Sequence, residues 1–264
     1  MSAELFSLKG KVVLITGATN GIGQYMAVGL YEAGAEVILT HRDTTDPQPT
    51  IDLIKASNPE SEAKISVIKA DFEKTALDKV FETIVEPAYK LSSSGKIDIL
   101  INNAGTASRA NLEDFEQSEF DRQLHVNLNI PIRLTQEIGR DMIKQGTHGK
   151  IIFTASLLSF QGGVRVAPYT TSKGGILQFS KAAANEWAPK NIQVNSIAPG
   201  WISSNMTNDL ETDPKANADI VNRIPAGRWG KPEDLKGATV FLASRASDYI
   251  TGECIVVDGG WMAR

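Results

Sequence analysis

Short runs rich in valine and isoleucine alternate with longer helix-like segments along almost the whole chain. The runs are Val12–Ile15, Glu36–Leu39, Ile65–Ile68, Ile97–Ile101, Ile151–Phe153, Val194–Ile197 and Cys254–Val257. Several lack apolar–polar alternation, which is typical of strands covered on both faces. The helix-like segments are Gly23–Ala33, Lys74–Leu91, Glu119–Gln145, Tyr169–Ala188 and Pro232–Ala243. This order predicts an α/β fold, a doubly wound Rossmann-like parallel sheet of about seven strands with helices on both faces.

Two polar segments fall outside this alternation of strands and helices. Residues Asp43–Thr50 contain proline and few apolar side chains, which predicts a surface loop. Residues Trp201–Arg228 interrupt the repeat, and their Asn, Asp and Pro content predicts one or two short helices on a mobile flap. Because no linker separates a second unit, residues 1–264 are assigned to a single domain.

The charge balance excludes a general attraction to polyanions. The net charge is −4, so we expect no nucleic-acid partner and no membrane surface. The single cysteine, Cys254, excludes an intrachain disulfide and is expected to be a buried strand residue. The N-terminus lacks the apolar run of a signal peptide, and no window approaches the ~18–20 apolar residues of a membrane span. A cytoplasmic protein is predicted. The histidines His41, His125 and His148 are scattered, so no metal site is predicted.

A glycine-rich sequence, Thr16–Gly23, directly follows the first predicted strand and opens a helix. Glycines let the backbone approach a pyrophosphate closely, and a helix N-terminus offers unpaired N–H groups and a positive dipole end. The spacing is G-x-x-x-G-x-G rather than the usual G-x-G-x-x-G of dinucleotide-binding folds. The segment therefore predicts a nucleotide site, with a plain strand-to-helix turn as the alternative.

Three residues of one region suggest proton-transfer chemistry. Tyr169 and Lys173 are four residues apart on a predicted helix, so their side chains share a face. A nearby ammonium is expected to lower the phenol pKa from its usual ~10. Ser156 ends a predicted strand, and its hydroxyl can bond a substrate oxygen. A nucleophilic serine is not expected, because no G-x-S-x-G elbow is present. An ordinary surface Tyr–Lys pair is the competing interpretation.

These motifs together resemble the classical short-chain dehydrogenases/reductases. Besides Thr16–Gly23 and Tyr169–Lys173, which matches Y-x-x-x-K, the chain has Asn102–Gly105 as N-N-A-G and Pro199-Gly200 after the sixth strand. The resemblance implies hydride transfer between a nicotinamide and a secondary alcohol or ketone, with CH–OH groups as donors. It also implies a homotetramer that pairs the helices at Glu119–Gln145 and Tyr169–Ala188 and uses the last helix and strand for a second interface.

The resemblance also assigns site residues. The catalytic set is Asn127, Ser156, Tyr169 and Lys173, with Asn127 holding a water that links Lys173 to solvent. The cofactor set is Gly17, Thr19, Asn20, Gly21, Ile22, Gly23, His41, Arg42, Asp71, Phe72, Asn103, Ala104, Gly105, Tyr169, Lys173, Pro199, Gly200, Ile202 and Ser204. Asp71 is expected at the adenine, and Ile202 and Ser204 near the nicotinamide carboxamide and phosphates.

The end of the second strand bears on the choice of cofactor. NAD-preferring enzymes usually place an acidic residue there to bind the ribose 2′-hydroxyl. This chain has His41-Arg42, and the Arg42 fork can pair with a 2′-phosphate. NADP(H) is therefore favoured. NAD(H) stays open, because the alternative is that Arg42 is a solvated loop charge beside Asp43.

A narrower resemblance concerns the substrate. The segments at 158–165, 185–188, 223–230 and 257–264 resemble the 2-dehydro-3-deoxy-D-gluconate 5-dehydrogenase family, also called 2-deoxy-D-gluconate 3-dehydrogenase, which is usually associated with NAD. This implies a small sugar-acid substrate, whose carboxylate needs a cation. Arg165 is the first candidate, ahead of Gln161 and Arg109, each with a plain surface-loop alternative.

The sequence also leaves alternative interpretations of its residues and of its function open. Trp201 and Met206 could form an apolar lid or pack against the core. A reductase of 3-oxoacyl thioesters would share every catalytic motif. A dinucleotide-sensing protein without turnover is a second rival, although the presence of all four catalytic residues argues against it.

Overall fold

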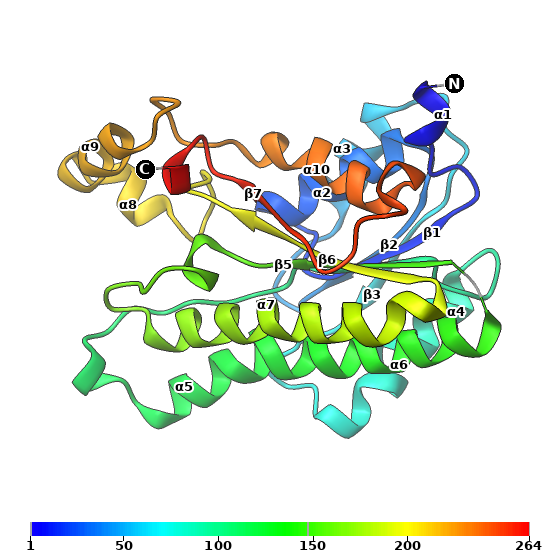
Figure 1. Cartoon of the computed structure of the whole chain (residues 1–264), viewed down its shortest axis with the longest axis horizontal. Helices are drawn as coiled ribbons and strands as arrows, with labels where there is room; N and C mark the ends of the chain where they lie inside the picture. Colours follow the sequence, from blue (N-terminus) through cyan, green and yellow to red (C-terminus); the bar gives the residue numbers. More distant parts are fainter. Residues whose placement is uncertain (1, 147, 264) are drawn as a thin grey trace.

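The computed structural model describes residues 2–146 and 148–263, and these form one parallel α/β sandwich (Figure 1). The strands are β1 (Val12–Ile15), β2 (Glu36–His41), β3 (Ile65–Lys69), β4 (Ile99–Asn102), β5 (Gly149–Thr154), β6 (Ile192–Pro199) and β7 (Cys254–Val257). In the described chain they pair in the order β3-β2-β1-β4-β5-β6-β7, all parallel. The predicted doubly wound fold is confirmed.

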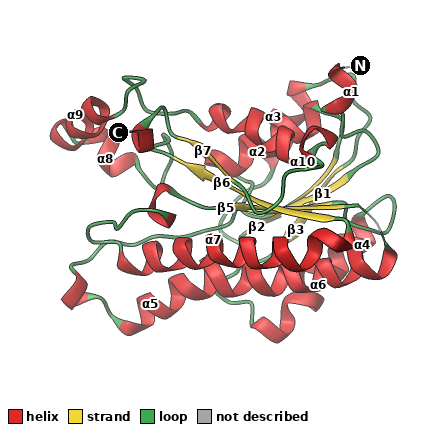
Figure 2. Ribbon diagram, in the orientation of Figure 1, coloured by secondary structure: helices red, strands yellow, loops and turns green. Residues whose placement is uncertain are grey.

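Helices cover both faces of the sheet, as Figure 2 shows. One face packs on α2 (Gly21–Glu32), α3 (Gln48–Ser57) and α10 (Lys236–Ala243); the other packs on α4 (Glu86–Leu91), α6 (Ile130–Gln145) and α7 (Ala167–Trp187), with α5 (Gln117–Leu124) alongside. Successive β1 residues point to opposite cores: Val12 and Leu14 to one, Val13 and Ile15 to the other. Because both faces are buried, the strand sequences are continuous apolar runs.

The structure differs from two of the sequence expectations for helices. Residues Asp43–Thr50 are not all loop, because α3 begins at Gln48; tertiary packing of Ile54 against the sheet overrides the weak local signal. The predicted helices 74–91 and 119–145 are interrupted by π-type turns at Phe81–Val85 and His125–Asn129. Pro87 and Pro131 explain the interruptions, because proline lacks the N–H that would bond the carbonyl four residues earlier.

The edge strand β7 is less buried than the strands inside the sheet. Cys254 is half-buried rather than buried, as expected of an edge position. Burial nevertheless raises the pKa of its thiol to about 12, so it is not a reactive thiolate. Within the described part of the chain, no helix is long and apolar enough to cross a bilayer.

The carboxyl ends of the strands meet one irregular region. Residues 201–228 fold into α8 (Asn208–Thr212) and α9 (Pro214–Arg223), in agreement with the expected short helices. These helices lie beside the C-terminal segment at one end of the sheet (Figure 1). Strand order reverses between β1 and β4, and ligands of such sheets bind outside the carboxyl ends at that point.

Candidate functional site

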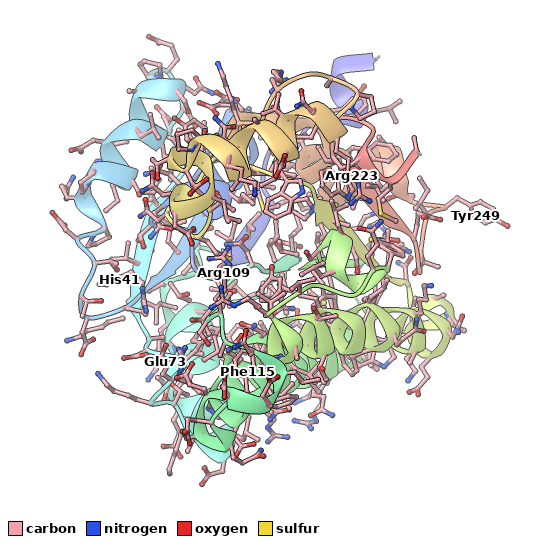
Figure 3. All side chains as sticks on the ribbon, turned by 90° about the vertical axis from the view of Figure 1, so that its left-hand side faces the viewer. His41, Glu73, Arg109, Phe115, Arg223 and Tyr249 are labelled. Carbon is pink, nitrogen blue, oxygen red and sulfur yellow. The ribbon has the colours of Figure 1, made fainter. Side chains whose placement is uncertain are left out.

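A cavity of about 720 Å³ opens along this carboxyl edge. Its wall runs from the end of β2 past β1, β4 and β5 to α9 and the C-terminal segment. Figure 3 looks onto this edge, with His41 and Arg223 on opposite sides of Arg109. The lining contains every predicted site residue except Asn127: Gly17, Thr19, Asn20, Gly21, Ile22, Gly23, His41, Arg42, Asp71, Phe72, Asn103, Ala104, Gly105, Arg109, Ser156, Gln161, Arg165, Tyr169, Lys173, Pro199, Gly200, Ile202 and Ser204.

The glycine-rich turn is packed too tightly for side chains. Gly17 has φ +62°, and a Cβ there would lie 2.7 Å from the Ala104 Cα. A Cβ on Gly23 would overlap the Asn103 amide and the Gly17 carbonyl. Gly21, with φ +53°, meets little beyond Ser204, whose Cβ would be 3.7 Å away. Two of the glycines therefore allow backbone packing, and Gly21 allows the left-handed turn that starts α2.

Asn103 holds this turn in place instead of pointing an amide at a ligand. Its Nδ2 donates to the carbonyls of Thr16 (3.1 Å) and Gly17 (2.9 Å), and its Oδ1 accepts from the Thr154 hydroxyl (3.2 Å). The Thr16 hydroxyl accepts from the backbone N–H groups of Asn103 and Ala104, at 3.0 Å each. These bonds join β1, β4 and β5 at the centre of the cavity wall.

The residues present fit the pyrophosphate of a dinucleotide. The N-terminus of α2 lines the cavity, has no acidic residue in its first turn, and receives no side-chain cap from Asn20. Its first N–H groups and dipole therefore face the cavity without a competing negative charge.

The loop after β2 presents a cation at one end of the cavity. His41 Nδ1 lies 3.0 Å from the Arg42 carbonyl and 3.1 Å from the Thr45 carbonyl, so this nitrogen carries the hydrogen. Asp43 pairs with Lys69 at 3.2 Å rather than with Arg42. Among the described residues, the exposed Arg42 side chain has no ion pair or hydrogen bond. The guanidinium is thus available to a phosphate.

The remaining predicted cofactor residues form the rest of that wall. The Asp71 carboxylate accepts from the Glu73 N–H at 3.1 Å and pairs with Lys74 at 3.0 Å. The Ser204 hydroxyl is 3.1 Å from the Thr207 hydroxyl. Gly200 lies against Asp258, whose Cα would be 2.6 Å from a Cβ at that position. Phe72, Ala104, Gly105, Pro199 and Ile202 complete the wall around them.

Tyr169, Lys173 and Ser156 converge at the centre of the cavity. Lys173 Nζ lies 5.6 Å from the centroid of the Tyr169 ring and donates to the Thr154 carbonyl at 2.6 Å. The Ser156 hydroxyl accepts from the Leu158 N–H at 3.2 Å, while Ser159 bonds the carbonyl of Lys173 at 2.7 Å. The turn after β5 is therefore tied to α7, which fixes the serine relative to the tyrosine.

Burial shifts the pKa values of Tyr169 and Lys173 in opposite directions. Burial lowers the pKa of the Lys173 ammonium to about 8. Burial also raises the pKa of the Tyr169 phenol, and a hydrogen bond with Ser156 only partly opposes this. The expectation of a lowered Tyr169 pKa is therefore wrong for the protein alone, because burial raises this pKa by more than the hydrogen bond with Ser156 lowers it. A lowered phenol pKa would require further positive charge in the cavity.

Asn127 lies behind the cavity wall, in the π-type turn before α6. Its side chain accepts from the Thr106 N–H at 2.8 Å and donates to the Thr106 carbonyl at 2.8 Å and to the Ser172 hydroxyl at 3.1 Å. Because Pro131 has no N–H, the Asn127 carbonyl lacks its ordinary helical partner. The structure thus gives Asn127 a clear role in holding the loop after β4.

The other end of the cavity is assembled from loops and the C-terminal segment. Arg165 is exposed, has φ +64°, and among the described residues its side chain has no partner. Arg109 pairs with Asp209 of α8 at 2.8 Å, which joins the flap to the loop after β4. Gln161 accepts from the Trp261 indole at 3.2 Å.

Sequence reasoning missed Arg223 and Trp261 as cavity residues. Arg223 lies 4.0 Å over the Trp261 ring, and both line the wall. Trp201 and Met206 also line it, and Trp201 packs edge-on against Trp229 and Trp261, in agreement with the packing interpretation for Trp201. The available sequence signals were the arginine at 223 and the tryptophan that follows Gly259-Gly260 near the C-terminal end.

The fold and this cavity define a nicotinamide-dependent oxidoreductase. More specifically, the chain belongs to the short-chain dehydrogenase/reductase family: a family model described as enoyl-(acyl carrier protein) reductase matches residues 17–262. The family that the sequence motifs predicted is confirmed.

Full-length relatives have related names. The chain is 48% identical over 262 residues to 2-dehydro-3-deoxy-D-gluconate 5-dehydrogenase of Bacillus subtilis (strain 168), covering 99% of this chain and 98% of the relative. An Agrobacterium tumefaciens protein, described as a candidate 2-deoxy-D-gluconate 3-dehydrogenase with bound NADP, is 43% identical, with a TM-score of 0.89 over 98% of this chain and 99% of that one. A gluconate 5-dehydrogenase from Burkholderia cenocepacia J2315, in complex with NADP and tartrate, is 34% identical, with a TM-score of 0.89 and full coverage of both chains.

Proposed function

We propose that this protein catalyses the reversible, NADP(H)-dependent oxidation of a hydroxyl group on a small sugar acid. The observation that carries the proposal is the convergence of Tyr169, Lys173 and Ser156 on one cavity whose other end is the glycine-rich turn. The names of the full-length relatives, which act on gluconate derivatives, support the substrate class.

Each of the central side chains has one task in this proposal. The Tyr169 hydroxyl takes the proton of the substrate alcohol in oxidation and returns it in reduction. Ser156 holds the substrate oxygen by a hydrogen bond. Lys173 supplies positive charge near the phenol, and Asn127 fixes the adjoining loop and orders a water that carries protons between Lys173 and solvent. A bound nicotinamide supplies hydride acceptance and donation at its C4 atom.

The phenol needs help to lose its proton at neutral pH. Burial raises its pKa, so in the protein alone Tyr169 stays protonated. A protonated phenol is the proton donor that ketone reduction requires. For oxidation, the positive charge of an oxidised nicotinamide adds to that of Lys173 and lowers the phenol pKa toward the working range. The direction of catalysis is therefore expected to follow pH.

NADP(H) is the preferred cofactor in this proposal. The Arg42 guanidinium lines the cavity without a partner among the described residues, and no carboxylate replaces His41 at the end of β2. The α2 N-terminus takes the pyrophosphate. Asp71, Phe72, Ile202 and Ser204 line the same cavity, and the proposal assigns the first two to the adenine and the last two to the nicotinamide end. Two solved relatives were crystallised with NADP, which supports the same choice.

A sugar acid matches the opposite end of the cavity. Arg165 offers an unpaired cation to a carboxylate. Its left-handed backbone conformation is uncommon for a non-glycine residue, and it is held by a hydrogen bond of 3.1 Å from the Ala110 N–H to the Arg165 carbonyl. We further propose that the whole chain works as a single domain, in a cytoplasmic homotetramer. The half-exposed edge strand β7 and fully exposed Tyr249 offer a surface for self-association.

The test is a nicotinamide absorbance assay on the purified protein. 2-Dehydro-3-deoxy-D-gluconate, D-gluconate and a 3-oxoacyl thioester are each supplied with NADP(H) and with NAD(H), in the direction that each substrate allows. The proposal predicts turnover of at least one of the sugar acids, faster with NADP⁺ than with NAD⁺. Turnover of the thioester alone, or no turnover of any substrate, would contradict it.

A further inference from the structure

The C-terminal segment turns back into the cavity wall. Gly259 (φ +63°) and Gly260 (φ +93°) take left-handed conformations that redirect the chain after β7. The Asp258 carboxylate caps the turn by accepting from the N–H groups of Gly260 (2.8 Å) and Met262 (2.7 Å). A side chain at Gly260 would collide with Pro225, 2.9 Å from its Cβ. The sequence Asp-Gly-Gly-Trp thus places the indole of Trp261 at the cavity.

The Trp261 ring is held from several directions. Arg223 stacks on it at 4.0 Å, and Trp201 packs edge-on with ring centroids 5.7 Å apart. The side chain is only 7% exposed although it lines the cavity. Because neighbours on both the ring face and the ring edge fix the indole, the direction of its N–H bond is fixed as well.

That N–H bond determines which way the Gln161 amide faces. An indole nitrogen only donates hydrogen bonds, so the atom of Gln161 at 3.2 Å must be the oxygen. The amide nitrogen then points away from Trp261. Gln161 lines the cavity, and no described residue accepts from its Nε2. Its two amide hydrogens are therefore left for a ligand of the cavity, in the same loop as Ser156 and Arg165.

We propose that Trp261 is a positioning residue that holds the Gln161 amide with its N–H groups toward the substrate. The inference rests on the proposed function, since it assigns Gln161 to an acceptor oxygen of the sugar acid. The acceptor is either the carboxylate or a hydroxyl oxygen, which share the chemistry that an amide donor recognises. Without the indole N–H, the Gln161 amide is free to rotate and present its oxygen instead. The partial negative charge of that oxygen would repel an anionic substrate.

The main test compares three substitutions in steady-state oxidation with NADP⁺. Gln161→Glu keeps an acceptor for Trp261 but replaces the donor with a negative oxygen, so KM for the sugar acid should rise about tenfold or more. Trp261→Phe keeps the ring and removes the N–H, so KM should rise about three- to tenfold with kcat changed less than about threefold. Trp229→Phe is the matched control: it removes an indole N–H bond to Asn217 in the same aromatic cluster and should leave KM unchanged.

A double-mutant cycle separates positioning from general damage. On a Gln161→Leu background, Trp261→Phe should have almost no further effect on KM, because its target is gone. Additive effects, or a Trp229→Phe change as large as that of Trp261→Phe, would overturn the proposal. If Trp261→Phe fails to fold, Gln161→Leu alone carries the test, and an unchanged KM would overturn it.

Competitive inhibition distinguishes the two acceptor groups. D-gluconate and D-glucitol differ by one carboxylate. A Gln161→Glu protein that loses affinity mainly for D-gluconate identifies the carboxylate as the acceptor, and equal loss for both identifies a hydroxyl. No loss for either overturns the assignment. Failure of the proposed function is seen separately, as absence of sugar-acid turnover by the unmodified protein while NADPH binding is retained.

Discussion

The nucleotide end of the cavity is built from backbone, whereas the substrate end is built from side chains. At the nucleotide end, Gly17 and Gly23 pack against neighbouring backbone with no room for a Cβ, and hydrogen bonds to main-chain groups lock the turn. At the substrate end, the contacts join side chains far apart in sequence: Gln161 with Trp261, and Arg109 with Asp209, each pair separated by 100 positions.

This difference determines how each end responds to substitution. Tight backbone packing tolerates almost no change, so substitutions at Gly17 and Gly23 act through shape and affect every substrate alike. The substrate end depends on single hydrogen bonds and charges, so its substitutions should change KM for one substrate more than another. Tyr169 and Lys173 lie between the two ends and serve both.

The largest effect is expected at this junction, from Lys173→Met. Loss of the ammonium should lower kcat about a thousandfold, because the phenol then lacks its positive neighbour. The same substitution should increase the stability of the folded protein. The Lys173 pKa is lowered from 10.5 to about 8 by burial, a penalty of roughly 3 kcal/mol below pH 8. Since the lost bond to the Thr154 carbonyl offsets part of it, the thermal midpoint should rise by roughly 2–6 °C at pH 7.

The sign of this stability effect can be checked by pH. A folded-state pKa below the unfolded one means that the unfolded chain binds more protons between pH 8 and pH 10.5, so the Lys173 contribution becomes less destabilising as pH rises. The advantage of Lys173→Met in scanning calorimetry without cofactor should therefore shrink toward pH 10. A thermal midpoint that falls at pH 7 would contradict the assigned burial penalty.

The second largest effect tests the nucleotide end. Gly23→Ala places a Cβ on the Asn103 amide and the Gly17 carbonyl, so the turn must shift. The Kd for NADPH, measured by fluorescence titration, should rise about thirtyfold, which corresponds to about 2 kcal/mol. Gly237→Ala, in α10 with open space at its Cβ, is the matched control and should leave Kd unchanged. Equal Kd values for the two variants would show that the packing at Gly23 is unimportant.

Arg42→Ala should have a smaller effect, confined to one cofactor. Removal of the unpaired guanidinium should lower kcat/KM for NADP⁺ about tenfold and leave that for NAD⁺ within about twofold. Lys69→Ala removes a neighbouring cation that is paired with Asp43 and does not line the cavity, and it should not change the ratio. A preference for NAD⁺ over NADP⁺ that survives Arg42→Ala unchanged would refute the choice of NADP(H).

The smallest effect is the pH dependence of the unmodified protein. Alcohol oxidation requires the Tyr169 phenol to lose its proton, ketone reduction requires the protonated phenol, and burial raises the pKa of that phenol above its ordinary value. Between pH 7 and pH 9, kcat/KM for alcohol oxidation should therefore rise several-fold and that for ketone reduction should fall. Profiles that change together in both directions would argue against proton transfer by this phenol.

The sequence predicted the nucleotide end better than the substrate end for a physical reason. Thr16–Gly23 and Tyr169–Lys173 are local patterns, since a strand-to-helix turn or one helix face fixes their geometry. The strands were predicted for the same reason, as buried apolar runs. Helix α3 was missed because its stability comes from packing Ile54 on the sheet, not from its own residues. Trp261 and Arg223 could not be placed, because only the folded chain brings Trp261 to Gln161 and Arg223 onto the Trp261 ring.

The pKa of Tyr169 shows a different limit of prediction from sequence. A pattern gives the spacing of the phenol and the ammonium, but not how deeply each is buried. Desolvation determines the direction of both pKa changes in the protein alone, and it depends on segments such as the loop after β5 that are distant from α7 in the chain.

The central claim is that the Tyr169 hydroxyl transfers the proton, and Tyr169→Phe tests it most directly. The measurement is kcat for sugar-acid oxidation alongside the Kd for NADPH on the same preparation. We predict a Kd within about threefold of the unmodified protein and a kcat at least about a hundredfold lower, because the ring remains and only the hydroxyl is lost. A Tyr169→Phe protein that binds NADPH normally and retains most of its kcat would contradict the account.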